Sequence, residues 1–222
     1  MKLFKYIIIF LFISLVSVYF LLQNHSVQNR LFENTVRGLF QADEIFMSDA
    51  LSVAVCGSRA PLPSPNRAET CLLVQAGTSK FIIDSGRGSA DNLQRWRVDY
   101  SDLEAVILSH LHSDHISDLH EVQFQSWLGG RKKPLSVIGP VGTASTAQGF
   151  EQAFKLDSIY RSEHHGAILP IEAYGYDVVE FDGDSALIFQ NEDTSITAFK
   201  VDHFPVDPCL LYTSPSPRDR LK

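Results

Sequence analysis

AVILSHLHSDHISDLHEVQ, residues 105–123, places four histidines and three acidic residues within nineteen positions. The apolar run Ala105–Leu108 predicts a buried strand, and the segment SDLHEVQFQSWL (117–128) predicts a helix. The histidines and aspartates therefore gather where a strand ends and a helix begins. This placement raises the question of whether they bind a metal ion.

Four side chains of this stretch have the chemistry and the spacing of metal ligands. His110 and His112 are two residues apart, so their side chains leave the same face of an extended backbone. The chain then turns toward the helix, which brings Asp114 and His115 round to the same end of the strand. Imidazole and carboxylate ligands suit a pair of borderline metal ions, and zinc is the default ion for such ligands with open positions. The stretch therefore predicts a zinc site.

The rest of the chain predicts strands at both ends of a domain, with helices between them. This order indicates a mixed α/β sandwich rather than a simple doubly wound sheet. Short apolar runs closed by glycine or proline predict the strands, and amphipathic runs predict the helices. The expected strands are 51–57, 70–77, 80–86, 105–110, 135–140, 177–181, 186–190 and 195–203, and the expected helices are 89–96, 117–128 and 143–161.

The first 22 residues differ from the rest of the chain. Lys2 and Lys5 precede an apolar segment, 6–22, whose length is at the lower limit for crossing a bilayer. A cleaved signal peptide would carry a small-x-small site where FLLQ (20–23) stands, so we expect an uncleaved anchor. The lysines place the N-terminus in the cytoplasm. We therefore expect a single-pass inner-membrane protein whose domain faces the periplasm or the exterior, with residues 23–48 as a polar linker.

Composition indicates one ordinary globular domain. The chain has 222 residues, of which 45% are hydrophobic and 20% charged, and its formal net charge is −7. GRKKP (130–134) is the only basic cluster, whereas a sequence-independent nucleic-acid binder shows a basic face. Nucleic acid is therefore not the expected partner, although composition does not exclude it. Cys56 and Cys71 flank a loop, and a disulfide in an exported domain and two unpaired buried cysteines fit the sequence equally well.

Several stretches resemble the metallo-β-lactamase superfamily. SHLHSDHISD (109–118) carries its HxHxDH signature, and FIIDSGRG (81–88) is similar to its strand that ends in an aspartate. The resemblance covers 51–208 and implies an α/β fold, the αββα sandwich, of which residues 49–208 hold the N-terminal part. Three further stretches resemble the branch that holds ribonuclease Z and one class of arylsulfatases: GSRAPLPSPNRAETCLLV (57–74), GRKKPLSVIGPVGT (130–143) and ITAFKVDHFPVDP (196–208).

The resemblance also assigns roles to residues. It implies two zinc ions that share a hydroxide, which is the nucleophile because two Lewis acids lower the pKa of bound water. Asp114 would be catalytic by orienting that hydroxide, and Asp84 would support the site from behind the ligands. His120 is expected at the surface or behind the ligands, and His164 and His165 in a loop. The implied ligands are His110, His112 and His203 for the first ion, and Asp114 and His115 for the second.

The C-terminal end departs from the family pattern. The family supplies a bridging aspartate and a final histidine after the segment that VDHFPVDP (201–208) matches, and CLLYTSPSPRDRLK (209–222) supplies neither. This tail also resembles the conceptual translation of a transposase-type sequencing adapter. We therefore expect residues 209–222 to be non-native and the hydrolase domain to be incomplete. Zinc binding by this chain should then be weak and its activity low.

Three functions follow from these observations. The first is a zinc-dependent hydrolase of phosphate or sulfate esters, since both have tetrahedral centres with charged oxygens that two zinc ions can clamp. It would act on a small anionic ester and be tethered to the membrane by its N-terminal helix. The alternative is a ribonuclease Z-like tRNA 3′-endonuclease, which the branch resemblance favours and the expected export and acidity oppose. A non-catalytic membrane-tethered binding module is a further alternative, provided that the tail is genuine.

Overall fold

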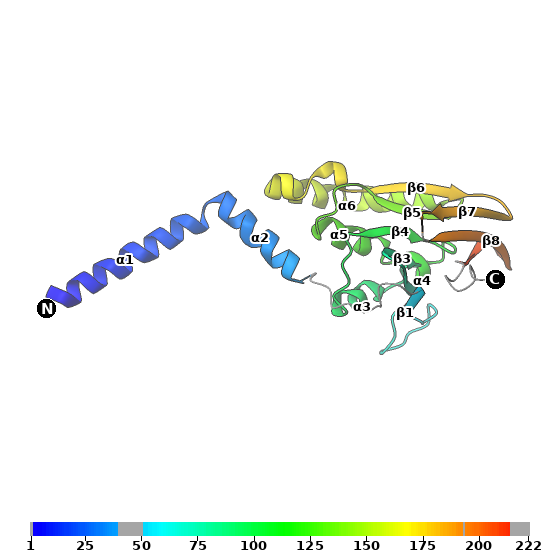
Figure 1. The fold of residues 1–222 in the computed structure, drawn as a ribbon, viewed down its shortest axis with the longest axis horizontal. Helices are drawn as coiled ribbons and strands as arrows, with labels where there is room; N and C mark the ends of the chain where they lie inside the picture. Colours follow the sequence, from blue (N-terminus) through cyan, green and yellow to red (C-terminus); the bar gives the residue numbers. More distant parts are fainter. Residues whose placement is uncertain (1, 40–50, 193, 214–222) are drawn as a thin grey trace. The chain divides into compact units, whose positions relative to one another are not determined.

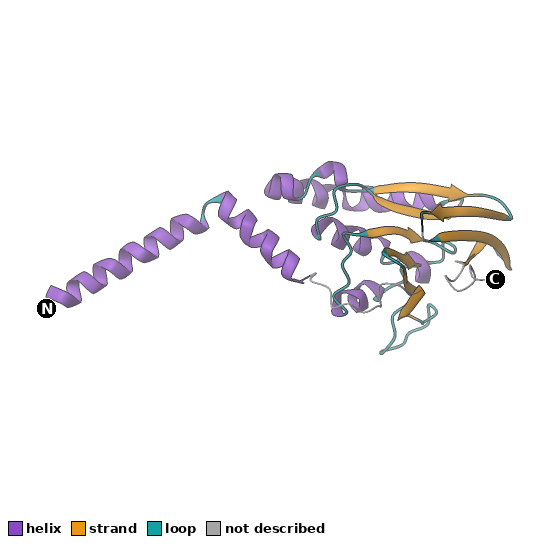
Figure 2. Cartoon of the chain, viewed as in Figure 1, coloured by secondary structure: helices purple, strands orange, loops and turns teal. Residues whose placement is uncertain are grey.

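The computed structural model describes residues 2–39, 51–192 and 194–213. The chain divides into a helical unit, Met1–Leu39, and a globular unit, Phe40–Lys222. Figures 1 and 2 show their helices and strands. Part of the expected linker, residues 40–48, lies outside the described residues.

The helical unit consists of two helices. α1 spans Lys2–Leu22, and its segment Phe4–Leu22 is long and apolar enough to cross a membrane. A secretory signal sequence shares this length and composition, so anchoring and orientation stay predictions. α2 (His25–Leu39) follows a short turn in which Asn24 Oδ1 accepts a hydrogen bond from the Ser26 N–H (2.9 Å). More than half of the expected linker is therefore helical.

The described part of the globular unit contains nine strands, four α-helices and two short 3₁₀ helices. All the strands expected from the sequence are present, with ends that differ by a few residues. β9 and α4 were not expected. The strands are β1 (Leu51–Gly57), β2 (Cys71–Ala76), β3 (Ser79–Ile83), β4 (Leu103–Ile107), β5 (Leu135–Pro140), β6 (Tyr176–Phe181), β7 (Ser185–Gln190), β8 (Ser195–His203) and β9 (Val206–Thr213). The helices are α3 (Ser89–Arg95), α4 (Ser113–Ile116), α5 (Leu119–Leu128), α6 (Thr143–His165), η1 (Gly166–Ile168) and η2 (Ile171–Ala173).

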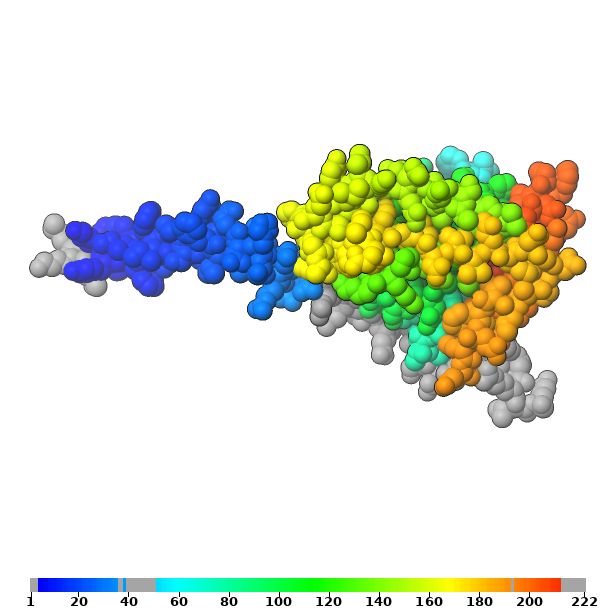
Figure 3. Space-filling model, turned by 90° about the horizontal axis from the view of Figure 1, so that it is seen from above, coloured from blue at the N-terminus to red at the C-terminus, as the bar shows by residue number. Residues whose placement is uncertain are grey.

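Six strands form one sheet in the order β1-β2-β3-β4-β5-β6. β1, β2 and β3 are antiparallel, whereas β3, β4, β5 and β6 are parallel, with helices in the connections between them. The carboxyl ends of β3 and β4 therefore meet at one edge, which places the loops that follow them next to each other. A second, antiparallel sheet has the order β7-β8-β9. α6, yellow-green to yellow, contributes to the face of the globular unit seen in Figure 3.

Apolar clusters lie on both faces of the six-stranded sheet. One joins Val106 of β4 to Leu93 of α3 and Leu119 of α5, so helices cover that face. The other joins Ile107 of β4 to Ile196 of β8, so the three-stranded sheet covers the opposite face. Successive residues of a strand point to opposite faces, which is why neighbours in β4 belong to different clusters. The expected α/β sandwich is confirmed, in the order helices, large sheet, small sheet.

β9 contains residues of the expected non-native tail. Cys209 and Leu210 are buried, and the strand pairs with β8. The Leu210 N–H also donates a hydrogen bond to the carbonyl oxygen of Ser109 (2.9 Å), immediately before the histidine stretch. The described part of the tail therefore completes the small sheet. Residues 214–222 lie outside the described residues, and the origin of the tail stays a prediction.

Cys56 and Cys71 form a disulfide bond, one of the two possibilities that the sequence left open. The bond joins β1 to the start of β2 and spans a sequence separation of 15. Both cysteines are fully buried in the cluster beneath the helices. Within the closed loop, the N–H groups of Ser58 and Arg59 donate hydrogen bonds to the carbonyl oxygen of Ala68 (3.0 Å each), so the neck of the loop is also held by backbone bonds.

Replacing Cys56 and Cys71 together by alanine should lower the free energy of unfolding of the globular unit by about 3 kcal/mol. The unfolded chain then regains the entropy that closure of a loop of about 15 residues removes. Denaturant unfolding of the full chain in detergent micelles, followed by tryptophan fluorescence, measures the change. Cys209→Ala removes a buried cysteine outside the disulfide and should cost about 1 kcal/mol. Equal losses in the two variants would contradict this prediction.

Candidate metal centre

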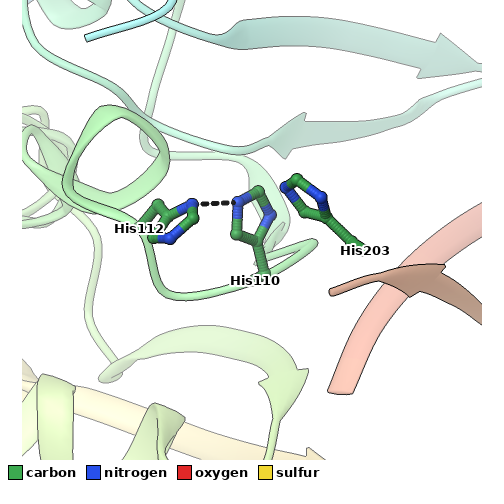
Figure 4. Close-up of side chains that lie close together, drawn as sticks. All are labelled: His110, His112 and His203. Atoms are coloured by element: carbon green, nitrogen blue, oxygen red, sulfur yellow. Dashed lines mark hydrogen bonds between the residues drawn. The ribbon is translucent and has the colours of Figure 1, made fainter. Parts of the chain in front are cut away.

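Three histidines converge where β4 ends. His110 and His112 lie on the loop between β4 and α4, and His203 is the last residue of β8. One ring nitrogen of each lies within 4.8 Å of the other two, and the rings lie close together in Figure 4. His110 is buried, whereas His112 and His203 are exposed, so solvent reaches the cluster. This spacing suits one ion held by three imidazoles, and among the described residues no other group of three potential ligands is this close.

Burial keeps His110 neutral, and its hydrogen bonds orient its ring. Its Nδ1 lies 3.0 Å from the Ser109 hydroxyl, which donates its own proton to Asp84 Oδ2 (2.8 Å). The hydroxyl therefore accepts a hydrogen bond from His110 Nδ1–H, which leaves the lone pair on Nε2. This Nε2 accepts a hydrogen bond from Nδ1 of His112 (3.0 Å), and a metal ion would take the place of that bond. Burial, together with the charge of His115, lowers the pKa of His110 to about 4. His110 is thus in the form that binds a metal ion at pH 7.

Asp84 holds the neighbouring histidine in place. Its carboxylate accepts a hydrogen bond from the Ser109 N–H (2.8 Å) and lies 2.7 Å from Nδ1 of His115. Burial by itself would lower the pKa of His115, but the hydrogen bond and the charge of Asp84 outweigh burial, and this pKa is raised. Asp84 engages Nδ1, so in the neutral form of His115 the Nε2 lone pair is the one that a metal ion would bind, as in carboxylate–histidine–metal arrangements.

Asp114 lies beside the three histidines rather than among them. It is buried, and its Oδ2 lies 3.6 Å from Nε2 of His115. The rings of His115 and His110 are 4.0 Å apart between centroids, so the Asp114–His115 pair adjoins the histidine cluster. No third described residue joins this pair as a potential ligand. The structure therefore brings the five expected ligands together as a set of three and a set of two, and their binding of zinc stays a prediction.

The loops after β3 and β4 approach each other closely. A Cβ atom at Gly86 would overlap the carbonyl oxygen of Asp114, so this position requires glycine. The Ser85 N–H donates a hydrogen bond to the carbonyl oxygen of His115 (2.7 Å), and the Asp118 N–H donates to that of Ser85 (2.7 Å). These bonds fix the loop that carries Asp84 against α4. The close approach explains the glycine of DSG (84–86), and its aspartate supplies the carboxylate that contacts Ser109 and His115.

Other residues that drew attention in the sequence have structural contacts. The half-buried ring of His120 stacks on Phe154 of α6, with centroids 3.3 Å and planes 5° apart, so it lies between helices and outside the ligand cluster. His164 and His165 are in the last turn of α6 rather than in a loop, because this helix continues past its expected end. Asp118 accepts a hydrogen bond from a backbone N–H in the first turn of α3 (3.1 Å) and acts as a cap.

Ser109 is the one residue of this network to which the sequence assigned no role. Its hydroxyl connects Asp84 to His110, and its backbone N–H binds Asp84 as well. The only feature of the sequence that could have pointed to Ser109 was its position between the buried strand and the first histidine. A serine there is too common to indicate a role, because loop serines are ordinary.

Known proteins similar to this chain were found by sequence. The model of the metallo-beta-lactamase superfamily matches residues 65–142. Ribonuclease Z of Mycobacterium marinum is 37% identical over 166 residues, covering 72% of this chain and 57% of that protein. Ribonuclease Z of Mycobacterium bovis is 34% identical with the same coverage. The chain therefore spans somewhat more than half the length of the curated relatives it matches.

Solved structures are similar in fold. The metallo-beta-lactamase fold protein YhfI from Bacillus subtilis matches with a TM-score of 0.55 at 24% identity. The match covers 75% of this chain and 58% of the YhfI chain. The short form of human tRNase Z matches with a TM-score of 0.57 at 19% identity, and the match covers 75% of this chain and 64% of the tRNase Z chain. At these identities the similarity establishes the fold, which is the one expected from the sequence.

The free energy of unfolding should depend on pH through His120. Burial lowers the pKa of His120 to about 4, with the charge of Asp157 acting against it, from an ordinary value of 6.5. Between these values the unfolded chain binds a proton that the folded chain does not, so stability falls as the pH decreases from about 7 to 4. His120→Phe keeps a stacked ring and removes the titration. Because the ring of His120 is only half-buried, solvent screening reduces the effect, and the loss of stability of the variant over this range should be smaller than that of the wild type by roughly 1 to 2 kcal/mol.

Denaturant unfolding at pH 7 and pH 4 measures this difference for the wild type and His120→Phe. His25→Phe is the control, because it changes a histidine of the helical unit and leaves the globular unit as it is. The explanation fails if the wild type and His120→Phe lose the same stability on acidification.

Asp84→Asn should weaken zinc binding by about 10- to 100-fold, because the amide no longer holds His115 by a charged hydrogen bond. Asparagine tolerates the left-handed backbone of position 84 (φ 58°), so the fold should be retained. Competition with a chromophoric chelator measures the affinity. Asp102→Asn makes the same chemical change in an exposed ion pair with Lys80 (2.7 Å) and should leave zinc binding unchanged. Equal affinities of Asp84→Asn and the wild type would refute the role of Asp84.

Proposed function

Since the chain carries a metallo-β-lactamase superfamily domain with ribonuclease Z homologues, we propose that it is a metal-dependent hydrolase that cleaves phosphodiester bonds of RNA. The observation that carries this proposal is the cluster of His110, His112 and His203 next to the Asp114–His115 pair. The relatives named ribonuclease Z support RNA as the substrate, and a precursor tRNA is the form that we propose.

The residues present fit a divalent metal ion, and zinc is the expected one. Three imidazole nitrogens lie within 4.8 Å of one another, and the buried His110 is neutral at pH 7. When bound, such an ion supplies a Lewis acid and lowers the pKa of water toward neutrality. The complete site of this superfamily is expected to hold two ions, with Asp114 and His115 as ligands of the second.

The protein's own residues prepare this site in three ways. Asp84 contacts Nδ1 of His115 directly and Nδ1 of His110 through the Ser109 hydroxyl, which favours the Nδ1–H form of both rings. Exposure of His112 and His203 leaves one side of the cluster open to a substrate. Asp114 is buried beside His115 and is the carboxylate that we propose to orient the attacking water.

RNA takes precedence over the small esters that the sequence alone placed first. Relatives that are 34–37% identical are ribonucleases Z, so they favour the tRNA alternative over the small-ester function. Nucleic acid, which the acidic composition argued against, thereby becomes the proposed substrate. Net charge is a property of the whole chain and does not describe the charge around one site.

A second candidate keeps the small phosphate or sulfate ester. The Cys56–Cys71 disulfide would persist in an oxidising compartment, and α1 is long enough to cross a bilayer. Both features favour a single-pass inner-membrane protein whose domain lies in the periplasm or outside the cell. A small anionic ester is accessible there, whereas a cytoplasmic precursor tRNA is not.

The test compares three substrates with the full chain in detergent and added zinc: a precursor tRNA, a bis-aryl phosphodiester and an aryl sulfate. We expect zinc-dependent cleavage of the tRNA at its 3′ side, at the low rate anticipated from the sequence. His110→Ala should reduce kcat/KM by at least about 100-fold, and His25→Ala should leave it unchanged. Zinc-dependent turnover of the bis-aryl phosphodiester or the aryl sulfate without tRNA cleavage would favour the second candidate. Turnover that His110→Ala does not reduce would rule out both.

A further inference from the structure

A pocket of about 820 Å³ opens between the loop that follows β1 and the start of α3. Its volume lies in the range of small-molecule sites. The pocket is unusual in charge, because one aspartate, Asp91, faces four arginines in a chain whose formal net charge is −7. We call it the arginine pocket, and its arginines are Arg59, Arg67, Arg87 and Arg95.

The fold builds this pocket from segments that are distant in sequence. Arg59 belongs to the loop that the Cys56–Cys71 disulfide closes. The guanidinium of Arg59 pairs with Oε1 of buried Glu69 (2.8 Å), and Oε2 of Glu69 accepts a hydrogen bond from the backbone N–H of Arg87 (3.0 Å). One carboxylate thus ties the disulfide-closed loop to the segment before α3 and sets the two walls of the pocket against each other.

Most of the positive charge in the pocket has no partner. Arg67 and Arg87 are exposed, and within 51–192 and 194–213 neither side chain makes an ion pair or a hydrogen bond. Arg95 donates to a neutral side-chain oxygen (2.9 Å). The buried Nε of Arg59 has no hydrogen-bond acceptor among the described residues. Guanidinium groups match phosphate oxygens with paired hydrogen bonds, so these side chains are suited to a ligand that carries several phosphates.

The arginine pocket and the candidate metal centre share one segment of chain. Arg87 lies three residues after Asp84, which binds His115. Between them, the Ser85 N–H binds the carbonyl oxygen of His115, and Gly86 touches the backbone of Asp114. A polyanion held by the arginines would therefore lie next to the loop that presents the expected metal ligands.

We propose that the arginine pocket binds phosphate groups of the nucleic-acid strand whose scissile phosphodiester lies at the histidine cluster. This inference rests on the proposed function, because it takes RNA to be the substrate. The arginines position the strand by its backbone and read no sequence. Their contribution should consequently be electrostatic and should weaken as salt is added.

The experiment measures binding of a fluorescein-labelled single-stranded RNA to the full chain in detergent micelles. EDTA is present so that the strand is not cut, and fluorescence anisotropy is recorded over a series of KCl concentrations. Arg67→Ala/Arg87→Ala removes two arginine side chains on which no described contact depends. Lys133→Ala/Lys155→Ala is the matched control, since both lysines are exposed outside the pocket and each double variant changes the net charge from −7 to −9.

The arginine double variant should bind the RNA about tenfold more weakly at moderate salt. The slope of log Kobs against log[KCl] should become shallower by about 1.4, because each phosphate of a single strand that is no longer neutralised lowers it by about 0.7. The lysine double variant should match the wild type in both quantities. A DNA strand of the same sequence, bound as tightly and with the same arginine dependence, would extend the ligand to single-stranded nucleic acid in general.

Two results would overturn the inference: a wild-type chain that binds no RNA, and an arginine double variant that binds like the wild type or like the lysine control. Cleavage of precursor tRNA is measured separately with zinc. Arginine-dependent binding without cleavage would therefore count against the proposed nuclease activity and not against the pocket. Cleavage with arginine-independent binding would count against the pocket alone.

Discussion

Asp84 is buried at the end of β3, where its two carboxylate oxygens bind the loop that follows β4. It contacts Nδ1 of His115 directly and reaches Nδ1 of His110 through the Ser109 hydroxyl, and so orients both rings. The contact exists only because β3 and β4 are parallel neighbours whose carboxyl ends meet at one edge of the sheet. The close packing of Gly86 on Asp114 brings the two loops within hydrogen-bonding distance. The remaining geometry of the centre depends on this one buried carboxylate.

The disulfide and Glu69 connect the loop between β1 and β2 to the segment that follows Asp84. Cys56–Cys71 closes the loop before β2, and Glu69 joins that loop to the backbone of Arg87. The segment 84–88 therefore contributes to both sites. Its first residue, Asp84, contacts an expected metal ligand, and Arg87 lines the arginine pocket. Chemistry at one end and binding at the other would be coupled through a stretch of only five residues.

Charge shows why composition is a poor guide to partners. The chain is acidic and its single basic run, GRKKP, lies elsewhere, which argued against nucleic acid. Folding nevertheless collects arginines that are up to 36 positions apart into one pocket, from Arg59 to Arg95. Electrostatic attraction depends on distance in space and is screened within about 10 Å at ordinary salt. The arginines gathered in one pocket therefore matter more for binding an anion than the sign of the chain's net charge.

The sequence by itself determined the family resemblance, the α/β sandwich and four of the expected ligands, because HLHSDH is contiguous and its strand and helix have local periodicity. It also named Asp84 and His203 by resemblance, although both are far from that stretch. Only the tertiary structure decided that Cys56 bonds Cys71, that Ser109 joins Asp84 to His110, that His120 stacks on Phe154 and that β9 completes the small sheet. Each of these is a contact between residues whose spacing carries no periodic signal. Such contacts are formed by the packing of whole layers, which local patterns along the chain do not encode.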